Sequence, residues 1–338
     1  MIKIAVNGYG VIGRRIADIV SIQPDMQLLG ITKVHPDYRA YSAIRKGYKV
    51  YAVDEKSKLA LKNGGVKVQG LVRDLIAQAD IVVDSSPEDT GAQNISLYKE
   101  LGKKAIFQGG EEHELTGFSF VAQCNYDKVQ DRKYVRVVSC NTTGLCRVLN
   151  SLDENFGISK ANVVIARRAT DPDDSSKGPI DSVVLDPPTV PSHHGPDVNT
   201  VLPNFPIVSM AFKVPTTHMH LHSLIVTVKS DASTDKVVDK LEGTNRVMLI
   251  NGKKDGFKST SNIIDLAREM GRPRNDVYES VIWRDSVQVV GKDIYLFMAI
   301  HQESIVTPEN IDAIRALNGK TNKTESIAMT NKSLGIGA

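Results

Sequence analysis

The first residues of the chain predict a strand, a glycine-rich turn and a helix, in that order. The apolar run 2–6 favours a buried strand, and the apolar residues after position 15 recur at helical spacing. Between them, Gly8, Gly10 and Gly13 form the pattern G-x-G-x-x-G. In this context the first glycine permits a tight turn, the second lets the backbone approach a pyrophosphate, and the third lets the helix pack on the strand. The opening of the chain therefore predicts a dinucleotide-binding domain.

Apolar strands and amphipathic helices continue to alternate as far as residue 139. Residues 80–84 and 104–107 are typical of buried strands, and residues 71–78 and 93–101 of helices. This alternation predicts a parallel sheet covered on both faces, with ligands bound at the carboxyl ends of its strands. Gly110, which follows the strand at 104–107, is therefore expected at the edge where the cofactor binds.

The end of the second predicted strand, residues 28–31, indicates which dinucleotide is accepted. An acidic side chain there would bind the 2′-hydroxyl of NAD. This chain has Thr32 and Lys33 instead, and Asp37 comes only later. Threonine and lysine suit a 2′-phosphate, so we expect NADP to be accepted alongside NAD. The alternative is that Lys33 is a solvated loop lysine.

One cysteine lies between a β-branched run and the start of an amphipathic helix. A thiol in the position of Cys140 meets the positive end of the helix dipole, which favours the nucleophilic thiolate. The first-turn amides around Asn141 and Thr142 suit an oxyanion or a phosphate. The alternative is a buried cysteine at a strand–helix junction. Its place after a strand of the dinucleotide domain, where a nicotinamide can reach it, favours a chemical role.

The second half of the chain predicts a different kind of sheet. Longer strands with polar alternation are expected at residues 207–214, 221–229, 277–283, 286–290 and 293–301, and several of them follow one another without an intervening helix. Helices are expected at 234–241 and around 263–270. Such a run predicts an α+β domain built on a mixed, largely antiparallel sheet. We expect a dinucleotide-binding domain over 1–139 and a catalytic domain over 140–303, with the terminal helices of about 304–338 packing back on the first.

Two groups of side chains in this half suggest chemistry. Arg167 and Arg168 end a predicted strand, where guanidinium groups bind phosphate or form surface ion pairs. His218, His220 and His222 alternate, so they would share one face of an extended segment. One of them is a candidate general base, and the alternative is that they are structural. Nothing nearby completes a zinc-binding spacing, so no metal site is expected.

Composition limits the possible partners and compartment. The 338 residues include 42 basic and 39 acidic side chains, a net charge of +3 that gives no support to nucleic-acid or membrane binding. The three cysteines, Cys124, Cys140 and Cys146, suggest no disulfide framework. We expect no signal peptide and no membrane span, and therefore a cytoplasmic protein.

Five motifs together resemble the archaeal-type phosphorylating glyceraldehyde-3-phosphate dehydrogenases over essentially the whole chain. They are N-G-Y-G-V-I-G-R-R at 7–15, S-C-N-T-T-G-L at 139–145, R-R-A-T-D-P at 167–172, H-H-G-P-D at 193–197 and H-Q-E-S at 301–304. The resemblance implies a Rossmann domain, a catalytic domain with an eight- or nine-stranded mixed sheet, and a homotetramer. It also implies oxidation of glyceraldehyde 3-phosphate with NAD(P)⁺ and phosphate to 1,3-bisphosphoglycerate, in glycolysis or gluconeogenesis.

The resemblance also implies roles by position, with Cys140 as the nucleophile. Residues that match the family's positions at or around the cofactor are Val11, Ile12, Gly110, Arg168 and Gln302. The glycine motif and the end of the second strand add Gly8, Gly10, Gly13 and Lys33 to the expected cofactor contacts. Residues expected around the substrate are Ser139, Asn141, Thr142, Arg167, His194 and Gly195. Two anion sites are needed, and Arg167, Thr142, Thr143, His193 and His194 are candidates for them without an assignment to either.

The general base cannot be carried over from the bacterial and eukaryotic branch. There the base histidine follows the cysteine by roughly one helix, whereas this chain has no histidine between Cys140 and His193. In the archaeal branch the base lies in the segment that matches residues 218–222. This favours His220, with His218 as the alternative.

Two other functions are compatible with the same features. An aspartate-semialdehyde dehydrogenase-like enzyme shares the Rossmann domain, the cysteine and the acyl phosphate product, but acts on a different aldehyde. A dinucleotide-sensing regulator would bind nicotinamide cofactor without turnover. Assays with both aldehydes, and of NAD(P)H formation with and without phosphate, would separate the three.

Overall fold

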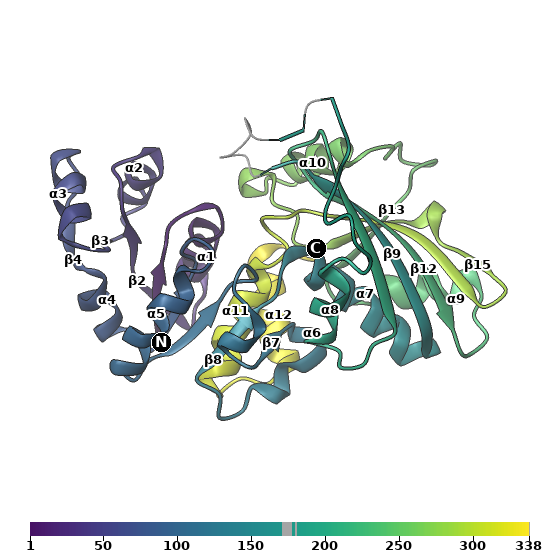
Figure 1. The fold of residues 1–338 in the computed structure, drawn as a ribbon, viewed down its shortest axis with the longest axis horizontal. Helices are drawn as coiled ribbons and strands as arrows, with labels where there is room; N and C mark the ends of the chain where they lie inside the picture. Colours follow the sequence, from purple (N-terminus) through teal and green to yellow (C-terminus); the bar gives the residue numbers. More distant parts are fainter. Residues whose placement is uncertain (171–177, 180, 338) are drawn as a thin grey trace. The chain divides into compact units, whose positions relative to one another are not determined.

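A computed structural model describes residues 1–170, 178–179 and 181–337, in two compact units. The first unit comprises Met1–Ser139 and Thr307–Ile336, and the second comprises Cys140–Val306 with Gly337. In the described residues each unit is built on one eight-stranded sheet (Figure 1).

The sheet of the first unit is entirely parallel, in the order β4-β3-β2-β1-β5-β6-β8-β7. Its strands are β1 (Ile2–Asn7), β2 (Met26–Lys33), β3 (Val50–Ala52), β4 (Val68–Leu71), β5 (Ile81–Asp84), β6 (Lys104–Phe107), β7 (Ser119–Phe120) and β8 (Tyr134–Val137). The strand order reverses beside β1, which pairs with β2 on one side and β5 on the other. The turn after β1 is therefore at the switch point where such sheets bind ligands. The predicted Rossmann-type sheet is confirmed.

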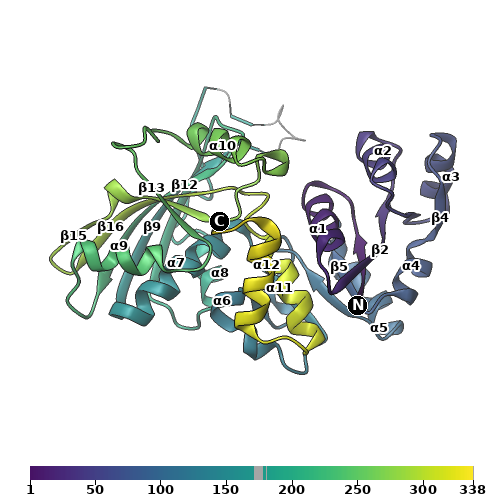
Figure 2. The ribbon, with the colours of Figure 1, turned by 180° about the vertical axis from the view of Figure 1, so that it is seen from behind.

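Helices cover this sheet and explain its apolar strands. They are α1 (Val11–Ile22), α2 (Tyr38–Arg45), α3 (Glu55–Asn63), α4 (Val72–Gln78), α5 (Thr90–Glu100), α6 (Ala122–Asn125), α11 (Thr307–Asn318) and α12 (Lys323–Leu334). The last two lie side by side, in yellow in Figure 2. Arg315 of α11 is buried and donates to both carboxylate oxygens of Asp25 at 2.8 Å. This bidentate contact ties the end of the chain to the start of β2.

The sheet of the second unit has the order β10-β11-β9-β12-β16-β14-β13, with β15 paired to β16. Its strands are β9 (Ile158–Arg168), β10 (Val184–Leu185), β11 (Ile207–Val214), β12 (His220–Val228), β13 (Val247–Ile250), β14 (Ser280–Trp283), β15 (Gln288–Val290) and β16 (Asp293–Ile300). Among the described strand pairs of this second sheet, only β9–β11 and β13–β14 are parallel. The predicted mixed, largely antiparallel sheet is confirmed.

The two faces of this second sheet have different surroundings. Every second residue of β12 is buried, from His220 to Val228, and α7 (Cys140–Phe156) packs against the sheet. A Cβ on Gly144 of α7 would lie 2.2 Å from Ile300 Cδ1, so the helix approaches β16 closely. The unit's other helices are α8 (His194–Asn199), α9 (Thr234–Glu242) and α10 (Thr260–Glu269).

The face of the sheet away from α7 carries large apolar side chains in contact with solvent. Val208, Met210, Tyr295 and Phe297 are 37% to 47% exposed. They alternate along β11 and β16 with buried residues, as expected where only one face of a sheet is covered. We call these four residues the open face. Nearer the end of β16, α10 packs on this same face against Val281 and Ala299. Among the described residues, no helix is both long and apolar enough to cross a membrane.

Candidate active site

The glycine turn after β1 is shaped by contacts of the protein with itself. Gly8 has a φ of 97°, and a Cβ there would lie 2.5 Å from the carbonyl oxygen of Ser85. A Cβ on Gly13 would lie 2.0 Å from the carbonyl oxygen of Gly8. Around Gly10, by contrast, a Cβ would meet no atom of the described residues within 4 Å. Gly8 and Gly13 are therefore required by packing, whereas the space beside Gly10 remains available to a ligand.

The start of α1 fits an anionic group. Gly10 caps the helix without a side chain, and none of its first-turn residues, all of them described, is acidic. Val11 and Ile12 begin the helix and are half-buried. Their main-chain N–H groups precede the first intrahelical hydrogen bonds, so they can donate to a phosphate. The cradle therefore fits a pyrophosphate.

Thr32, predicted to suit a 2′-phosphate, faces the interior instead. It is buried, accepts a hydrogen bond from the N–H of Gly8 at 2.7 Å and donates to Asn7 Oδ1 at 2.8 Å. Asn7 in turn donates to Tyr98, whose hydroxyl donates to Asp84 Oδ2 at 2.6 Å. This network supports the glycine turn from the protein interior. Because the Thr32 hydroxyl is buried and already bonded to Gly8 and Asn7, the interpretation of Thr32 as a phosphate ligand was wrong.

Lys33 is not a solvated loop lysine, because it forms an ion pair with Asp37. It ends β2, and its Nζ lies 2.7 Å from Asp37 Oδ2. The other carboxylate oxygen of Asp37 caps α2 by accepting from the N–H of Ala40 at 2.9 Å. Burial alone would raise the pKa of Asp37, but the bonds with Lys33 and Ala40 lower it overall. The ion pair is therefore present across the physiological pH range.

Ser139, the last residue of the first unit, lies against the turn after β6. A Cβ on Gly109 would be 2.3 Å from Ser139 N, whereas a Cβ on the predicted Gly110 would be only in ordinary contact with Glu88, at 3.5 Å. Gly109 is thus the glycine that packing requires here. The Gly-Gly pair at a strand end was the available signal for this packing role of Gly109, which sequence reasoning did not predict. The expected place of Gly110 at the cofactor edge stays a prediction.

Cys140 begins α7 and is partly exposed. Burial raises the pKa of its thiol, and this outweighs the opposing effects of Arg167, Arg168 and the main-chain amides of Asn141 and Cys140. The expected helix-start stabilisation of the thiolate is therefore present but does not prevail in the resting protein. An arriving anionic oxygen would meet the same two arginines and the same amides.

The two residues after Cys140 direct their side chains into the protein. Asn141 is buried, accepts from His222 Nε2 at 2.9 Å and contacts His194 Nε2 through its amide nitrogen at 3.1 Å. The hydroxyl of the buried Thr142 donates to Asp197 of α8. These residues can contact a substrate through their main-chain amides, while their side chains hold neighbouring elements.

Only two of the three alternating histidines share a face. His220 and His222 are buried in β12, whereas His218 precedes the strand and is exposed. Met219, between them, has a φ of 66°, which breaks the extended geometry. The expected common face of all three was therefore wrong for His218.

Burial keeps the two strand histidines neutral. Burial, followed by the charge of Arg167, lowers the pKa of His220 well below its usual range and that of His222 to about 3. His220 Nδ1 accepts a hydrogen bond from the main-chain N–H of Arg168 at 3.0 Å. A neutral His220 therefore carries its proton on Nε2.

The two arginines at the end of β9 differ in their surroundings. Arg167 forms an ion pair with Asp186, which also lies 3.6 Å from Lys213. The buried Nε of Arg167 has no hydrogen-bond partner in the described part of the chain. Arg168 acts on Cys140 and His220 through its charge. Asp171 and Pro172, of the same motif, lie outside the described residues.

His194 and Gly195 are buried at the start of α8. Burial and the neighbouring charges of His193, Arg167 and His222 lower the pKa of His194 to about 2. The N–H of Gly195 donates to Ser209 Oγ at 2.8 Å. His194 therefore contacts Asn141 from α8, and Gly195 joins α8 to β11 through Ser209.

Gln302, predicted near the nicotinamide, has its side-chain amide engaged at both ends. Its Oε1 accepts from the N–H of Met219 at 2.8 Å and its Nε2 donates to the carbonyl of Thr217 at 3.1 Å. These bonds hold the turn that precedes β12. The structure thus shows Gln302 shaping the histidine segment.

Sequence reasoning missed the partners that hold these side chains, above all Ser192, Ser209 and Asp197. Ser192 and Asp197 flank the histidine pair at 193–194, whereas Ser209 lies in β11, and only Asp197 belongs to a quoted motif. No described group of three or more histidine, cysteine or carboxylate side chains is arranged to hold a metal ion.

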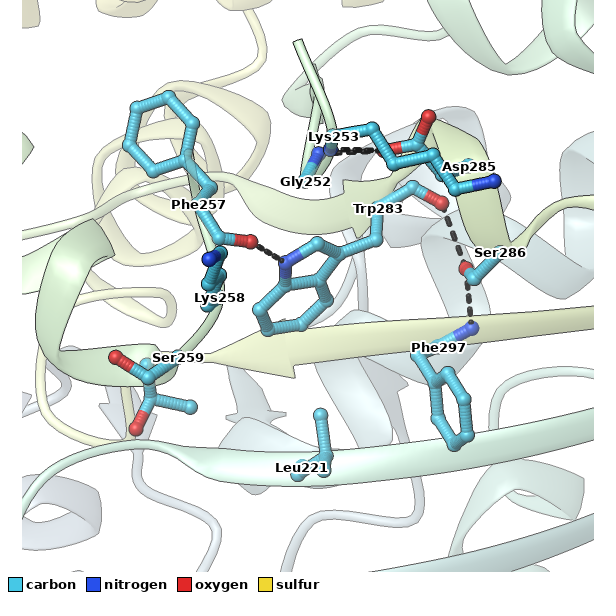
Figure 3. Close-up of a pocket in the computed structure, with 11 residues that line it drawn as sticks. Leu221, Gly252, Lys253, Phe257, Lys258, Ser259, Trp283, Asp285, Ser286 and Phe297 are labelled. Atoms are coloured by element: carbon cyan, nitrogen blue, oxygen red, sulfur yellow. Dashed lines mark hydrogen bonds between the residues drawn. The ribbon is translucent and has the colours of Figure 1, made fainter. Parts of the chain in front are cut away.

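A separate cavity of about 840 Å³ lies on the side of the second sheet away from His220 and His222. Figure 3 shows Phe257, Trp283 and Phe297 around it, with the indole N–H of Trp283 donating to the carbonyl of Phe257 at 2.7 Å. Leu221 lies between the two histidines in sequence but lines this cavity. Leu221 and Phe297 make the cavity continuous with the open face.

Comparison with known proteins gives consistent results. Residues 139–286 match the family described as glyceraldehyde 3-phosphate dehydrogenase, C-terminal domain. A glyceraldehyde-3-phosphate dehydrogenase of Metallosphaera sedula is 50% identical over 337 residues, covering 100% of this chain and 98% of the relative. Proteins of the same name from Methanoregula boonei and Methanothermus fervidus are 47% and 48% identical, each over 99% of this chain and 97% and 99% of their own lengths.

Proposed function

This chain belongs to the glyceraldehyde-3-phosphate dehydrogenase family, and we propose that it oxidises D-glyceraldehyde 3-phosphate with NAD(P)⁺ and inorganic phosphate to 1,3-bisphosphoglycerate. The observation that carries the proposal is the setting of Cys140. Cys140 is a partly exposed residue that begins α7, within the electrostatic influence of Arg167 and Arg168. A nucleophile placed among cations suits a phosphorylated aldehyde.

The first unit holds the cofactor. The N–H groups of Val11 and Ile12, beside the open space at Gly10, bind its pyrophosphate, and Gly8 and Gly13 maintain the turn. When bound, the nicotinamide supplies the hydride acceptor. Lys33, Gly110, Arg168 and Gln302 complete the proposed set of residues at or around the cofactor. Of these, Gln302 acts through the turn that it holds.

Catalysis proceeds through a covalent bond to Cys140. Its sulfur attacks the aldehyde carbon as the thiolate, a C–S bond forms, and the carbonyl oxygen takes up the proton that the thiol has lost, which gives the thiohemiacetal. The main-chain N–H of Asn141 and the charges of Arg167 and Arg168 stabilise the thiolate before the attack. After the thiohemiacetal loses a hydride and its hydroxyl proton, a thioester remains on Cys140. An oxygen of inorganic phosphate attacks the thioester, the C–S bond breaks, and the thiolate leaves.

His220 is the proposed acid–base residue. Because its Nδ1 accepts from Arg168, its Nε2–H meets the substrate oxygen first as a hydrogen-bond donor. To take up the hydroxyl proton at Nε2, the ring must first move its own proton from Nε2 to Nδ1. Nδ1 must then give up the hydrogen bond that it accepts from the N–H of Arg168. His218 is the alternative, since it is exposed and lies two residues before His220.

Two anions must bind near Cys140, the phosphate of the substrate and the attacking phosphate. Arg167 is the leading candidate for one of them, because its buried Nε lacks a hydrogen-bond partner among the described residues. Ser139, Asn141 and Thr142 contribute main-chain amides, while His194 and Gly195 shape the wall of the site. Thr143 and His193 remain candidates without an assigned anion.

The direct test is the absorbance of NAD(P)H formed from glyceraldehyde 3-phosphate with and without phosphate. We expect formation that depends on phosphate. An enzyme of the aspartate-semialdehyde class would instead turn over aspartate semialdehyde in the same assay. A regulator would bind the cofactor and show no turnover with either aldehyde.

Both NAD and NADP are proposed as cofactors, and Asp37 sets the balance between them. A 2′-phosphate at the end of β2 has to compete with Asp37 for Lys33. Asp37→Asn removes the competing charge while asparagine keeps the cap of α2. We expect the ratio of kcat/KM for NADP over NAD to rise by about tenfold, since charge-assisted hydrogen bonds contribute about 1.5–3 kcal/mol. An unchanged ratio would show that Lys33 does not contact the 2′-phosphate.

A homotetramer in the cytoplasm is the proposed assembly and location. The open face, with the adjoining cavity of Figure 3, offers an apolar surface to a second copy of the chain. Met210→Lys or Phe297→Lys should reduce the mass measured by analytical ultracentrifugation. A tetramer that persists in both variants would place the contact elsewhere.

A further inference from the structure

A continuous row of buried polar side chains runs behind the nucleophile. It begins at His222 of β12, passes through Asn141 and His194, and continues to the hydroxyls of Ser192 and Ser209. The heavy-atom distances from one group to the next are 2.9, 3.1, 3.1 and 2.8 Å. All five residues are buried. We call this row the Asn141 chain.

The donors of the Asn141 chain can all point the same way. The oxygen of Asn141 accepts from His222 Nε2–H, and its amide nitrogen donates to His194 Nε2. His194 then carries its proton on Nδ1 and donates to Ser192, which donates to Ser209. Ser209 accepts from the N–H of Gly195 and donates to the carbonyl of Ser192 at 3.1 Å. Each donor therefore has an acceptor, and the orientation of the Asn141 amide is determined from both sides.

The two histidines of the chain stay uncharged at neutral pH. Burial, the largest cause, lowers the pKa of His222 to about 3 and that of His194 to about 2. A neutral ring has one donor and one acceptor, as the ordered chain requires. Among the described residues, His222 Nδ1 is buried without a hydrogen-bond partner. The one hydrogen bond of the ring to these residues is therefore the bond from Nε2 to Asn141.

We propose that His222 is a positioning residue for the nucleophile, holding the Asn141 side chain and, with it, the main-chain N–H of Asn141 beside the thiol of Cys140. The link is short, because Asn141 directly follows Cys140 in the first turn of α7. Its main-chain amide stabilises the thiolate, as do Arg167 and Arg168. This inference rests on the proposed role of Cys140. His222 itself transfers no proton and contacts no reacting atom.

The test is the pH dependence of alkylation of Cys140 by iodoacetamide, followed by mass spectrometry of its peptide. His222→Leu removes the donor to Asn141 and should slow alkylation at neutral pH by about tenfold, corresponding to a rise of about one unit in the apparent thiol pKa. His222→Gln keeps an N–H donor and should recover most of the wild-type rate. Turnover should follow the same order, through kcat rather than through KM for the cofactor.

Two further variants keep the test decisive. Ser223→Ala changes the next residue of β12, on the opposite face, and should alkylate like the wild type. Asn141→Ala removes the side chain that His222 holds but keeps the main-chain N–H, and should slow alkylation as His222→Leu does. If His222→Leu does not fold, Asn141→Ala decides the question.

Two results would overturn the proposal. An alkylation rate equal to that of the wild type in Asn141→Ala or in a folded His222→Leu would show that these side chains do not hold the main-chain N–H of Asn141 beside the thiol. Equal slowing in His222→Gln and His222→Leu would show that shape matters and the hydrogen bond does not. Alkylation needs neither cofactor nor substrate, so the outcome is independent of whether the dehydrogenase assay succeeds.

Discussion

The two units of this protein build their candidate sites from different parts of the chain. In the first unit the binding turn is main chain, held by glycines that leave no room for a Cβ and by Thr32 bonded to the N–H of Gly8. In the second unit the site is made of side chains from α7, β9, β12 and α8. The cofactor turn of the first unit depends on the absence of side chains at Gly8 and Gly13. The site of the second unit depends on hydrogen bonds between buried side chains.

This difference predicts two separate kinds of failure. Adding a methyl group to the glycine turn should impair cofactor binding and leave the thiol chemistry intact. Changing the buried side chains around Cys140 should impair the chemistry and leave cofactor binding intact. A variant that impairs both would contradict the comparison.

The largest expected effect is that of Cys140→Ser. A hydroxyl is a far weaker nucleophile than a thiolate, so phosphate-dependent NAD(P)H formation should fall by about 10³–10⁶-fold. Cofactor affinity, measured by isothermal titration calorimetry, should remain as in the wild type. Near-normal turnover would refute the covalent mechanism.

His220→Ala should have the next largest effect. Loss of a general acid–base group slows the reaction by about 10²–10⁴-fold, and the burst of NAD(P)H in single-turnover measurements should slow to the same extent. His218→Ala is the matched comparison, because His218 is exposed and outside β12. If the His218 variant is the impaired one, the base has been assigned to the wrong histidine.

The sequence predicted the first site better than the second, for a physical reason. The spacing of Gly8, Gly10 and Gly13 is a local property, and the structure confirms the strand and helix around it. The inward direction of Thr32 depends on Asn7 and Gly8, which a linear sequence does not bring together. The ion pair of Lys33 with Asp37 was within reach of sequence reasoning, since the two are four residues apart.

In the second unit the sequence identified candidates but not their geometry. The three alternating histidines predicted a shared face, and the φ of Met219 removes His218 from it. Nothing local to Asn141 indicates that its amide meets histidines 53 and 81 residues away. Contacts of this kind depend on strand order and helix packing, which the residue pattern specifies only as a class of sheet.

A smaller effect is expected from methyl groups in the glycine turn. Gly13→Ala places a Cβ against the carbonyl of Gly8, so the turn must distort, and cofactor affinity should fall by about tenfold or more. Gly10→Ala meets no described atom of the protein, so the apo protein should unfold at the wild-type temperature. Its cofactor affinity should nevertheless fall, because the methyl group occupies space intended for the ligand. Unchanged binding in Gly10→Ala would mean that the pyrophosphate lies elsewhere.

The last expected effect concerns stability between about pH 6.5 and 5, where the buried histidines of the second unit bind protons on unfolding. His222 and His194 have pKa values of about 3 and 2 in the folded protein, below the ordinary 6.5. Between the folded pKa values and about pH 6.5, the unfolded chain therefore binds more protons than the folded protein does. The free energy of unfolding thus rises with pH in this range and falls as the pH drops below about 6.5. Each histidine should cost about 1.4 kcal/mol of unfolding free energy per pH unit.

Trp283, the sole tryptophan of the chain, lies in β14 and reports on the second unit by its fluorescence. Urea unfolding followed at this residue should lose stability between about pH 6.5 and 5, and His222→Gln should make the loss shallower by about one proton. Asp37→Asn, in the first unit, should leave the slope unchanged. An equal slope in wild type and His222→Gln would mean that His222 is protonated in the folded protein. The ordered Asn141 chain, which needs an uncharged ring, would then be wrong.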